Sequence, residues 1–471
     1  MPTWPVHLKI ANKLKEKYGY TDDFIIGNVI PDTMNGYVVD NPSNIFHHSV
    51  THYSSAEYTD FLEININKFL NDNREKLDNE IILGTYTHLL ADLYFNEYTQ
   101  KHHFKKKSDK VIAILNDGTI EEMIHPMVIK QNDFKVFGDY FIKNKEVGNK
   151  ASMTKDTLNL SKDLNYEIQK EDIEKTIDKI NEIVDSEIQE EEPYRMFTEK
   201  ELLDVLNNCY EKIERDMTEL ELDKQISKVF DNYVNRYDIK DEDIDYKYYH
   251  SYRVMNYSKF LADKLNLPKE DRNLATIIGL FHDIGRFEQE KIYDNYEDTK
   301  EFDHGDYGEK VLLKKGIIEQ LPVAYENYPL VGKAVRYHNK YSIGEGLNEQ
   351  ELLHAKIIRD ADKIDIIDYM PRKRIRLKAF DEDSEFEVRD SIKEEFFKEQ
   401  QIHRNDYAKT TNSEIVIIML AHVFDINFKC TAQYIIDNGV LETFYNNLPN
   451  KEKYKEYFEL AKKHVKEMIK C

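Results

Sequence analysis

Apolar residues along most of this chain recur at intervals of three and four, the spacing that places side chains on one face of an α-helix. In the segment NLATIIGLFHDIGRF the residues that follow this pattern are Leu274, Ile277, Ile278 and Phe281. Only 16 glycines and 11 prolines interrupt the 471 residues. Because glycine and proline are the strongest breaks in helical patterns, the sequence predicts a nearly all-α protein, with room for isolated short strands.

The length of the chain predicts more than one domain, since domains commonly contain ~100–200 residues. An acidic stretch, DSEIQEEEPYR, is typical of a solvated connector between helices. After it, Thr198 and Glu201 have the spacing of a capping box that begins a long helix, which we expect to end the first domain. The predicted fold therefore has two helical domains, residues 1–220 and residues 221–471.

The charge and the apolar runs restrict the partners of the chain. It carries 66 Lys and Arg against 89 Asp and Glu, a formal net charge of −23, which repels a phosphate backbone. We therefore expect no nucleic-acid partner. The first residues contain no basic region followed by an apolar stretch, and no apolar run approaches the ~20 residues that span a bilayer. These features predict a cytoplasmic protein without a transmembrane segment.

Cysteine is not available for a thiolate metal site. The three cysteines, Cys209, Cys430 and Cys471, form no CxxC pair, and their number is odd. Any metal ion must therefore be held by histidine and carboxylate side chains.

Potential metal ligands occur in a fixed order in the second half of the chain. His282 and Asp283 fall in the predicted last turn of the helix that contains Phe281, and Gly285 is placed to end this helix as a left-handed cap. His250 lies at the expected start of another amphipathic segment. The whole ordered set is His250, His282, Asp283, His304, His338 and Asp362. Neutral imidazoles and carboxylates suit the divalent ions of Mn, Fe, Co, Ni or Zn.

This order, together with the phrases HDIGR and RDADKID, resembles the HD-domain metal-dependent phosphohydrolase superfamily over roughly residues 246–370. The ligands that the resemblance implies are His250, His282, Asp283 and Asp362, with His304 and His338 as the additional histidines of members that hold two metals. Asp283 and Arg286 are the expected catalytic residues, and a carboxylate such as that of Asp283 can bridge two ions ~3.5–4 Å apart. Arg286 and Lys340 are the expected contacts of a substrate phosphate.

The last ligand has two candidates, Asp360 and Asp362. Residues two apart on a helix point to different sides, so one of them at most faces the site. The phrase ADKID matches the last motif of the superfamily best when Asp362 is the ligand.

A second set of potential ligands lies within the first hundred residues. His88 and Asp92 are four apart, as are His48 and His52, so that on a helix each pair projects from one face and can bind one ion. Over roughly residues 4–100 the set resembles the zinc-dependent phospholipase C family, which has an all-helical fold. The residues that match the zinc ligands of that family are His7, Asp32, His52, His88 and Asp92.

The sequence therefore predicts a metal-dependent hydrolase of small-molecule phosphate esters, either monoesters or diesters, with nucleotides among the candidate substrates. The predicted site is a two-metal centre in the second domain, with zinc as the candidate ion of the first domain. Three alternatives stay open. They are phospholipase C-type hydrolysis by the first domain, di-iron oxygenation, and a metal-binding sensor or scaffold without catalysis.

Overall fold

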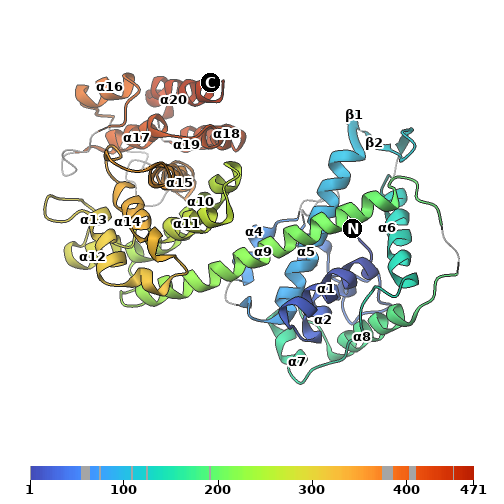
Figure 1. Ribbon diagram of the computed structural model, residues 1–471. Coiled ribbons are helices and arrows are strands. Elements are labelled where there is room, and N and C mark those ends of the chain that lie inside the picture. The colour runs from blue at the N-terminus through green and yellow to red at the C-terminus, as the bar shows by residue number, and fades with distance from the viewer. Residues whose placement is uncertain are drawn as a thin grey trace. The chain divides into compact units, whose positions relative to one another are not determined.

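The computed structural model describes residues 2–54, 64–73, 76–107, 110–123, 126–189, 192–373, 386–402, 410–448 and 450–470. Most of the regular structure in these ranges is helical (Figure 1), which confirms the predicted all-α class. A small antiparallel sheet with the strand order β1-β2-β3 accompanies the helices. None of the helices in the described part of the chain combines the length and the apolar composition that crossing a membrane requires.

The chain divides into two compact units, Met1–Thr218 and Glu219–Cys471. The division falls within α9 (Glu199–Val234), which begins at the predicted capping box, where the backbone N–H of Glu201 donates to Thr198 Oγ1 at 3.2 Å. The helix does not end with the first unit, as the sequence had suggested, because its last turns also pack into the core of the second unit. The residues that do so include Leu222, Ile226 and Phe230.

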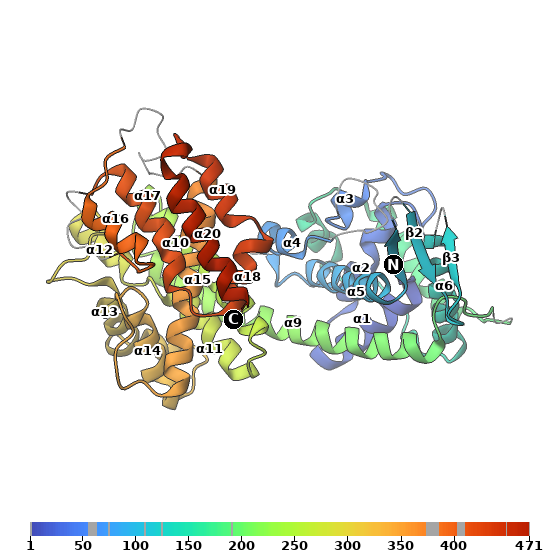
Figure 2. The ribbon, with the colours of Figure 1, turned by 90° about the horizontal axis from the view of Figure 1, so that it is seen from above.

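The first unit is organised around two helices that cross closely, α2 (Asp22–Met34) and α5 (Glu80–His102), which lie side by side in Figure 2. Gly84 makes this approach possible, because a Cβ atom there would lie 2.2 Å from the carbonyl oxygen of Phe24. The other elements of this unit, besides α9, are α1 (Trp4–Tyr18), α3 (His48–Thr51), α4 (Ile66–Asn73), β1 (Phe104–Lys107), β2 (Lys110–Ile114), β3 (Ile120–Met123), α6 (Pro126–Lys143), α7 (Thr157–Leu160) and α8 (Lys170–Asp185).

The second unit contains two apolar cores that share α15 (Glu349–Lys373). One core joins α15 to α10 (Glu242–Lys264) and α11 (Lys269–Phe281), and the other joins its later turns to the helices that follow. The remaining helices are α12 (Arg286–Tyr293), α13 (His304–Glu309), α14 (Tyr328–Tyr337), α16 (Asp390–Phe397), α17 (Asn412–Ala421), α18 (Lys429–Asp437), α19 (Val440–Asn447) and α20 (Lys455–Lys470).

The end of α11 differs from the prediction in two respects. The helix ends at Phe281, so His282 is its C-cap and Asp283 follows in a turn. Gly285 is not a left-handed cap, since its φ of −71° is right-handed and it precedes α12. A glycine is needed there for space, because a Cβ atom would lie 2.2 Å from the carbonyl oxygen of His304. The segment after α11 thereby lies directly against the start of α13.

Candidate metal centres

The six ligands predicted in the second half of the chain converge on one place, the C-terminal cluster. The cluster consists of His250, His282, Asp283, His304, His338 and Asp362. They come from inside α10, from the turn after α11, from the start of α13, from the end of α14 and from α15. His250 thus lies within its helix and not at its start, as the sequence had suggested. All of these side chains are buried except that of Asp362, which is 18% exposed.

The two carboxylate oxygens of Asp283 face different pairs of histidines. Asp283 Oδ2 lies 3.5 Å from His250 Nε2 and 3.6 Å from His282 Nε2. Asp283 Oδ1 lies 3.3 Å from both His304 Nε2 and His338 Nε2. Such a carboxylate is suited to bridge two cations, each held on the other side by imidazoles.

Hydrogen bonds fix the orientation of all four imidazole rings. Each ring has its Nδ1 against an acceptor at 2.6–2.8 Å. The acceptors are Asp365 for His250, the Gly279 carbonyl for His282, Asp298 for His304 and the Val335 carbonyl for His338. In a neutral imidazole whose Nδ1 donates, Nε2 carries a lone pair. All four Nε2 atoms are therefore presented to the cluster as potential ligands.

The Nε2 atoms of the histidines lie close to one another in two pairs. His250 Nε2 and His282 Nε2 are 3.3 Å apart, and His304 Nε2 and His338 Nε2 are 3.0 Å apart. Where both rings are neutral and oriented in this way, no hydrogen lies on either side of the contact, so the arrangement is repulsive by itself. His250, whose pKa is raised to about 10, instead carries a proton at Nε2, which lies in its contact with His282. A metal cation between the nitrogens makes both contacts attractive, and the residues present therefore fit a divalent metal ion.

The protonation of the rings differs within the cluster. Burial lowers the pKa of His282 to about 3 and that of His304 to about 4, so both rings are neutral at pH 7, as metal binding requires. Burial and the ammonium of Lys247 also act to lower the pKa of His250, but hydrogen bonds with three aspartates outweigh them and raise it to about 10. A metal ion bound at His250 Nε2 would replace that proton.

The structure distinguishes the two candidates for the last ligand. Asp362 Oδ1 lies 3.2 Å from His250 Nε2, inside the cluster. Asp360 lies on another side of α15, where it accepts hydrogen bonds from the backbone N–H of Asn427 at 2.9 Å and from the hydroxyl of Thr431 at 2.6 Å. Asp360 therefore supports the packing of the segment that precedes α18, and Asp362 faces the cluster.

Arg286, expected at the site from the sequence, lies beside the cluster. Its Nη1 donates to the Tyr296 carbonyl at 2.6 Å and to Gln289 Oε1 at 2.7 Å, which holds the side chain in place. Its Nε is 3.7 Å from Asp283 Oδ1, and this buried atom has no hydrogen-bond partner among the described residues. The guanidinium is thus held with an N–H group available next to the carboxylate.

Lys340 is engaged elsewhere. Its ammonium pairs with Asp303 Oδ1 at 2.6 Å and with Asp306 Oδ2 at 3.2 Å. These contacts compensate its charge within the protein, and the predicted contact of Lys340 with a substrate phosphate stays a prediction.

Lys247 also contacts the cluster, although the sequence had not predicted it there. Its Nζ lies 2.5 Å from Asp283 Oδ2, and its side chain is 14% exposed. The signal was present in the sequence, because Lys247 precedes His250 by three residues in a helical segment and therefore shares its face.

The first unit brings together the five ligands predicted there, the N-terminal cluster. It consists of His7, Asp32, His52, His88 and Asp92, each at most 6% exposed. Asp92 Oδ1 is 3.3 Å from His7 Nε2, and Asp92 Oδ2 is 3.4 Å from His88 Nε2. His52 Nε2 lies 3.3 Å from Asp32 Oδ1 and 3.1 Å from His88 Nε2. The predicted pairing of His88 with Asp92 on one helix face is thus present in α5.

Several buried atoms of the N-terminal cluster lack hydrogen bonds. Both ring nitrogens of His7 and both carboxylate oxygens of Asp92 lack a well-aligned hydrogen bond among the described residues, although His7 Nε2 and Asp92 Oδ1 lie 3.3 Å apart. Leaving a buried polar group unsatisfied costs ~1–3 kcal/mol. A metal ion would satisfy these donor atoms together, so this set also fits one. His48, by contrast, stacks on His52 with 3.8 Å between ring centroids and has its Nδ1 3.2 Å from Ser54 Oγ.

The second unit is thus a helical domain that carries a two-part centre of histidine and aspartate. Residues 248–367 match the family model of the HD domain, and this range includes all six residues of the C-terminal cluster. The match supports the predicted resemblance to the HD-domain superfamily, whose members are generally metal-dependent hydrolases. Comparisons with curated proteins and with solved structures find no significant match. The resemblance of the first unit to zinc-dependent phospholipase C gains no support and stays a prediction.

Two matched substitutions in α15 separate metal binding from packing. Asp362→Asn should reduce the metal content of the C-terminal cluster with little change in stability, because it removes a charged ligand atom that faces the cluster. Asp360→Asn should leave the metal content unchanged and lower the free energy of unfolding by about 1–3 kcal/mol, because an amide NH2 group, which cannot accept a hydrogen bond, replaces one of the two acceptor oxygens of Asp360. Elemental analysis and denaturant unfolding check both. The opposite pattern would show that Asp360 is the ligand.

Proposed function

We propose that the second unit is a metal-dependent phosphohydrolase that cleaves a phosphomonoester or phosphodiester of a small molecule. The observation that carries the proposal is the position of Asp283, whose two oxygens face two separate pairs of histidines. The match of residues 248–367 to the HD domain supports the general class of reaction.

The residues that would hold the metal ions fall into two groups that share Asp283. One group is His250, His282 and Asp362, and the other is His304 and His338. A pair of divalent ions supplies Lewis acidity and an acidified water for the attack on phosphorus. The protein's part is to fix the ligands through the Nδ1 hydrogen bonds, so that the site needs little reorganisation when the ions bind.

Two cations of the chain lie where they would contact the phosphate group of a substrate. Arg286 has a buried N–H group without a partner among the described residues, and Lys247 approaches the same carboxylate from the other oxygen. A planar guanidinium and an ammonium both bind phosphate oxygens, and their charges offset the negative charge of the substrate. We infer that both orient the phosphate relative to Asp283.

Replacement of the bridging carboxylate tests the proposal. Asp283→Ala should lower the hydrolysis of p-nitrophenyl phosphate or bis(p-nitrophenyl) phosphate, whichever wild type cleaves faster, by more than ~100-fold, since losing a group that merely supports a metal ligand already costs ~10–100-fold. Asp263→Ala, an exposed carboxylate on α10, is the matched control and should retain activity. Normal turnover by a folded Asp283→Ala variant would refute the proposal. Metal-dependent dioxygen consumption without phosphate release would favour the oxygenase alternative.

The role of Lys247 is tested by Lys247→Met, which keeps an unbranched side chain of nearly the same length and removes its charge. We expect the KM for the phosphate ester to rise about tenfold or more, because a hydrogen bond to a charged group contributes ~1.5–3 kcal/mol. The metal content should stay that of wild type. Lys240→Met, at an exposed position just before α10, serves as the control. A variant with unchanged KM, or one that loses its metal, would contradict a role in substrate binding.

We also infer that the N-terminal cluster holds a metal ion, with zinc as the candidate. The unsatisfied atoms of His7 and Asp92 support this inference, as does the contact of two Nε2 atoms at 3.1 Å. Phospholipase C-type hydrolysis by this unit stays a prediction.

The second centre is tested in the Asp283→Ala background, in which the C-terminal cluster should be depleted of metal. Adding His88→Ala should remove the remaining bound metal, measured by elemental analysis of the full chain. Adding His102→Ala, an exposed histidine on the same helix, should not. Equal metal content in the two folded double variants would show that the N-terminal cluster is not a metal site.

A further inference from the structure

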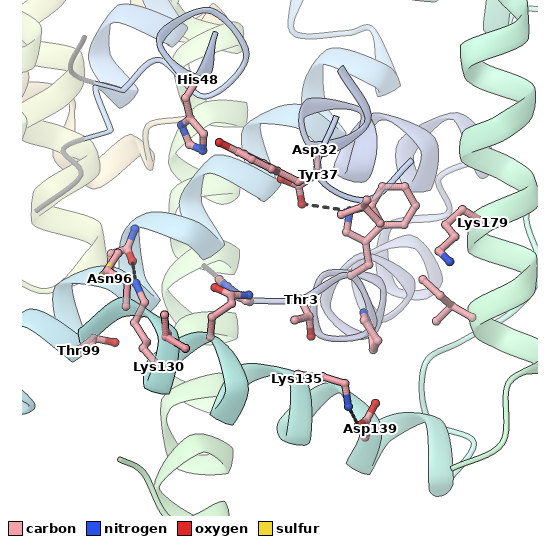
Figure 3. Close-up of a pocket in the computed structure, with 18 of the residues that line it drawn as sticks. Thr3, Asp32, Tyr37, His48, Asn96, Thr99, Lys130, Lys135, Asp139 and Lys179 are labelled. Atoms are coloured by element: carbon pink, nitrogen blue, oxygen red, sulfur yellow. Dashed lines mark hydrogen bonds and ion pairs between the residues drawn. The ribbon is translucent and has the colours of Figure 1, made fainter. Parts of the chain in front are cut away.

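The first unit encloses a cavity of about 870 Å³, which is within the range of ~300–1,000 Å³ typical of small-molecule sites. It lies among the start of α1, α5, α6 and α8 (Figure 3). Much of its wall is apolar, and the residues that make it so include Trp4, Pro5, Phe104, Met127, Val128 and Ile183. The cavity therefore favours a ligand with an apolar body.

Two of the lysines that line the cavity already have carboxylate partners. Lys135 Nζ lies 2.9 Å from Asp139 Oδ2, a pair that Figure 3 shows at the wall formed by α6. Lys179 Nζ lies 3.0 Å from Glu182 Oε2 on α8. Their charges are compensated within the protein and partly exposed to water.

Lys130 also lines the cavity, but unlike Lys135 and Lys179 it is buried and pairs with a neutral amide. It is 2% exposed, and its ammonium donates to the amide oxygen of Asn96 at 3.1 Å, as Figure 3 shows. Within the ranges that the structure describes, no carboxylate lies at ion-pair distance from it. Burial lowers the pKa of this ammonium to about 8, although the charge of Asp92 acts to raise it. A buried charge next to a neutral amide is costly unless an anion joins it.

The polar groups divide the cavity into two sides. Figure 3 shows Lys130 with Asn96 and Thr99 on one side, and Asp32 with Tyr37 on the other. Asp32 Oδ2 accepts a hydrogen bond from the indole N–H of Trp4 at 3.1 Å, and its carboxylate also belongs to the N-terminal cluster. While no metal ion is bound there, the negative charge of Asp32 disfavours an anion on its side and directs an anionic group towards Lys130.

We propose that this cavity binds a small apolar molecule with one anionic group, a carboxylate or a phosphate, which pairs with the ammonium of Lys130. The apolar body of the ligand occupies the space beside Trp4 and Met127. The proposed anion contact is Lys130 and not a residue of either metal centre, although Asp32 of the N-terminal cluster lines the same cavity. The proposal is independent of the hydrolase activity of the second unit.

The chain contains its own probe for the test, because Trp4 is its one tryptophan and lines the cavity. Full-length protein is titrated with dodecanoate, dodecyl phosphate and the neutral dodecanol, each below its micelle-forming concentration, while tryptophan fluorescence is recorded. We expect saturable binding of at least one anion, with at least tenfold higher affinity than that of dodecanol. The preferred anion then distinguishes a carboxylate from a phosphate head.

Two lysine variants test whether the anionic group of the ligand binds at Lys130. Lys130→Met should lower the affinity for the preferred anion at least tenfold and leave the binding of dodecanol unchanged, whereas Lys135→Met should bind the anion as wild type does. Circular dichroism checks that each variant is folded. The proposal is overturned if dodecanol binds as tightly as both anions, if no probe changes the fluorescence, or if folded Lys130→Met keeps the affinity of wild type. Anion binding that a chelator abolishes and Lys130→Met does not would assign the anion to the N-terminal cluster instead.

Discussion

The buried carboxylate of Asp283 is the group on which the site of the second unit depends. Burial acts to raise its pKa, but Lys247 and the neighbouring histidines outweigh that effect and hold the pKa well below its usual value. The carboxylate therefore stays charged although it is only 2% exposed. Each of its oxygens lies close to a different pair of imidazoles. This charged group is thus placed where it would interact favourably with a pair of divalent ions.

The two clusters are held in different ways. In the C-terminal cluster every imidazole is oriented by a hydrogen bond at Nδ1, and the bond of His250 joins it to Asp365, 115 residues away. In the N-terminal cluster the close crossing of α2 and α5 brings Asp32 to His88 and Asp92, while His7 and Asp92 have atoms without a well-aligned hydrogen bond. We therefore expect the geometry of the C-terminal cluster to exist before a metal binds, and that of the N-terminal cluster to depend more on its ion.

The all-α class and the membership of the C-terminal cluster followed from the sequence, because helical spacing and a motif order are properties of local segments. The choice of Asp362 over Asp360 followed from its motif, and the geometry agrees with it. The function of these residues as ligands stays a prediction. The helix ends were harder to predict from the sequence. Gly285, for example, is needed because the backbone of His304 lies close to it, and no local sequence pattern encodes this contact between two segments.

The sequence by itself determined which faces of which helices carry histidine and aspartate, since the period of 3.6 residues fixes the direction of each side chain within its own helix. Only the tertiary structure decided which of these faces meet. In the tertiary structure Lys247 lies beside Asp283, and Lys340 pairs with other carboxylates. Lys130 lies in a cavity where none of the described carboxylates is at ion-pair distance. The physical reason is that distances between helices depend on how their apolar surfaces pack, and packing is a property of the whole unit.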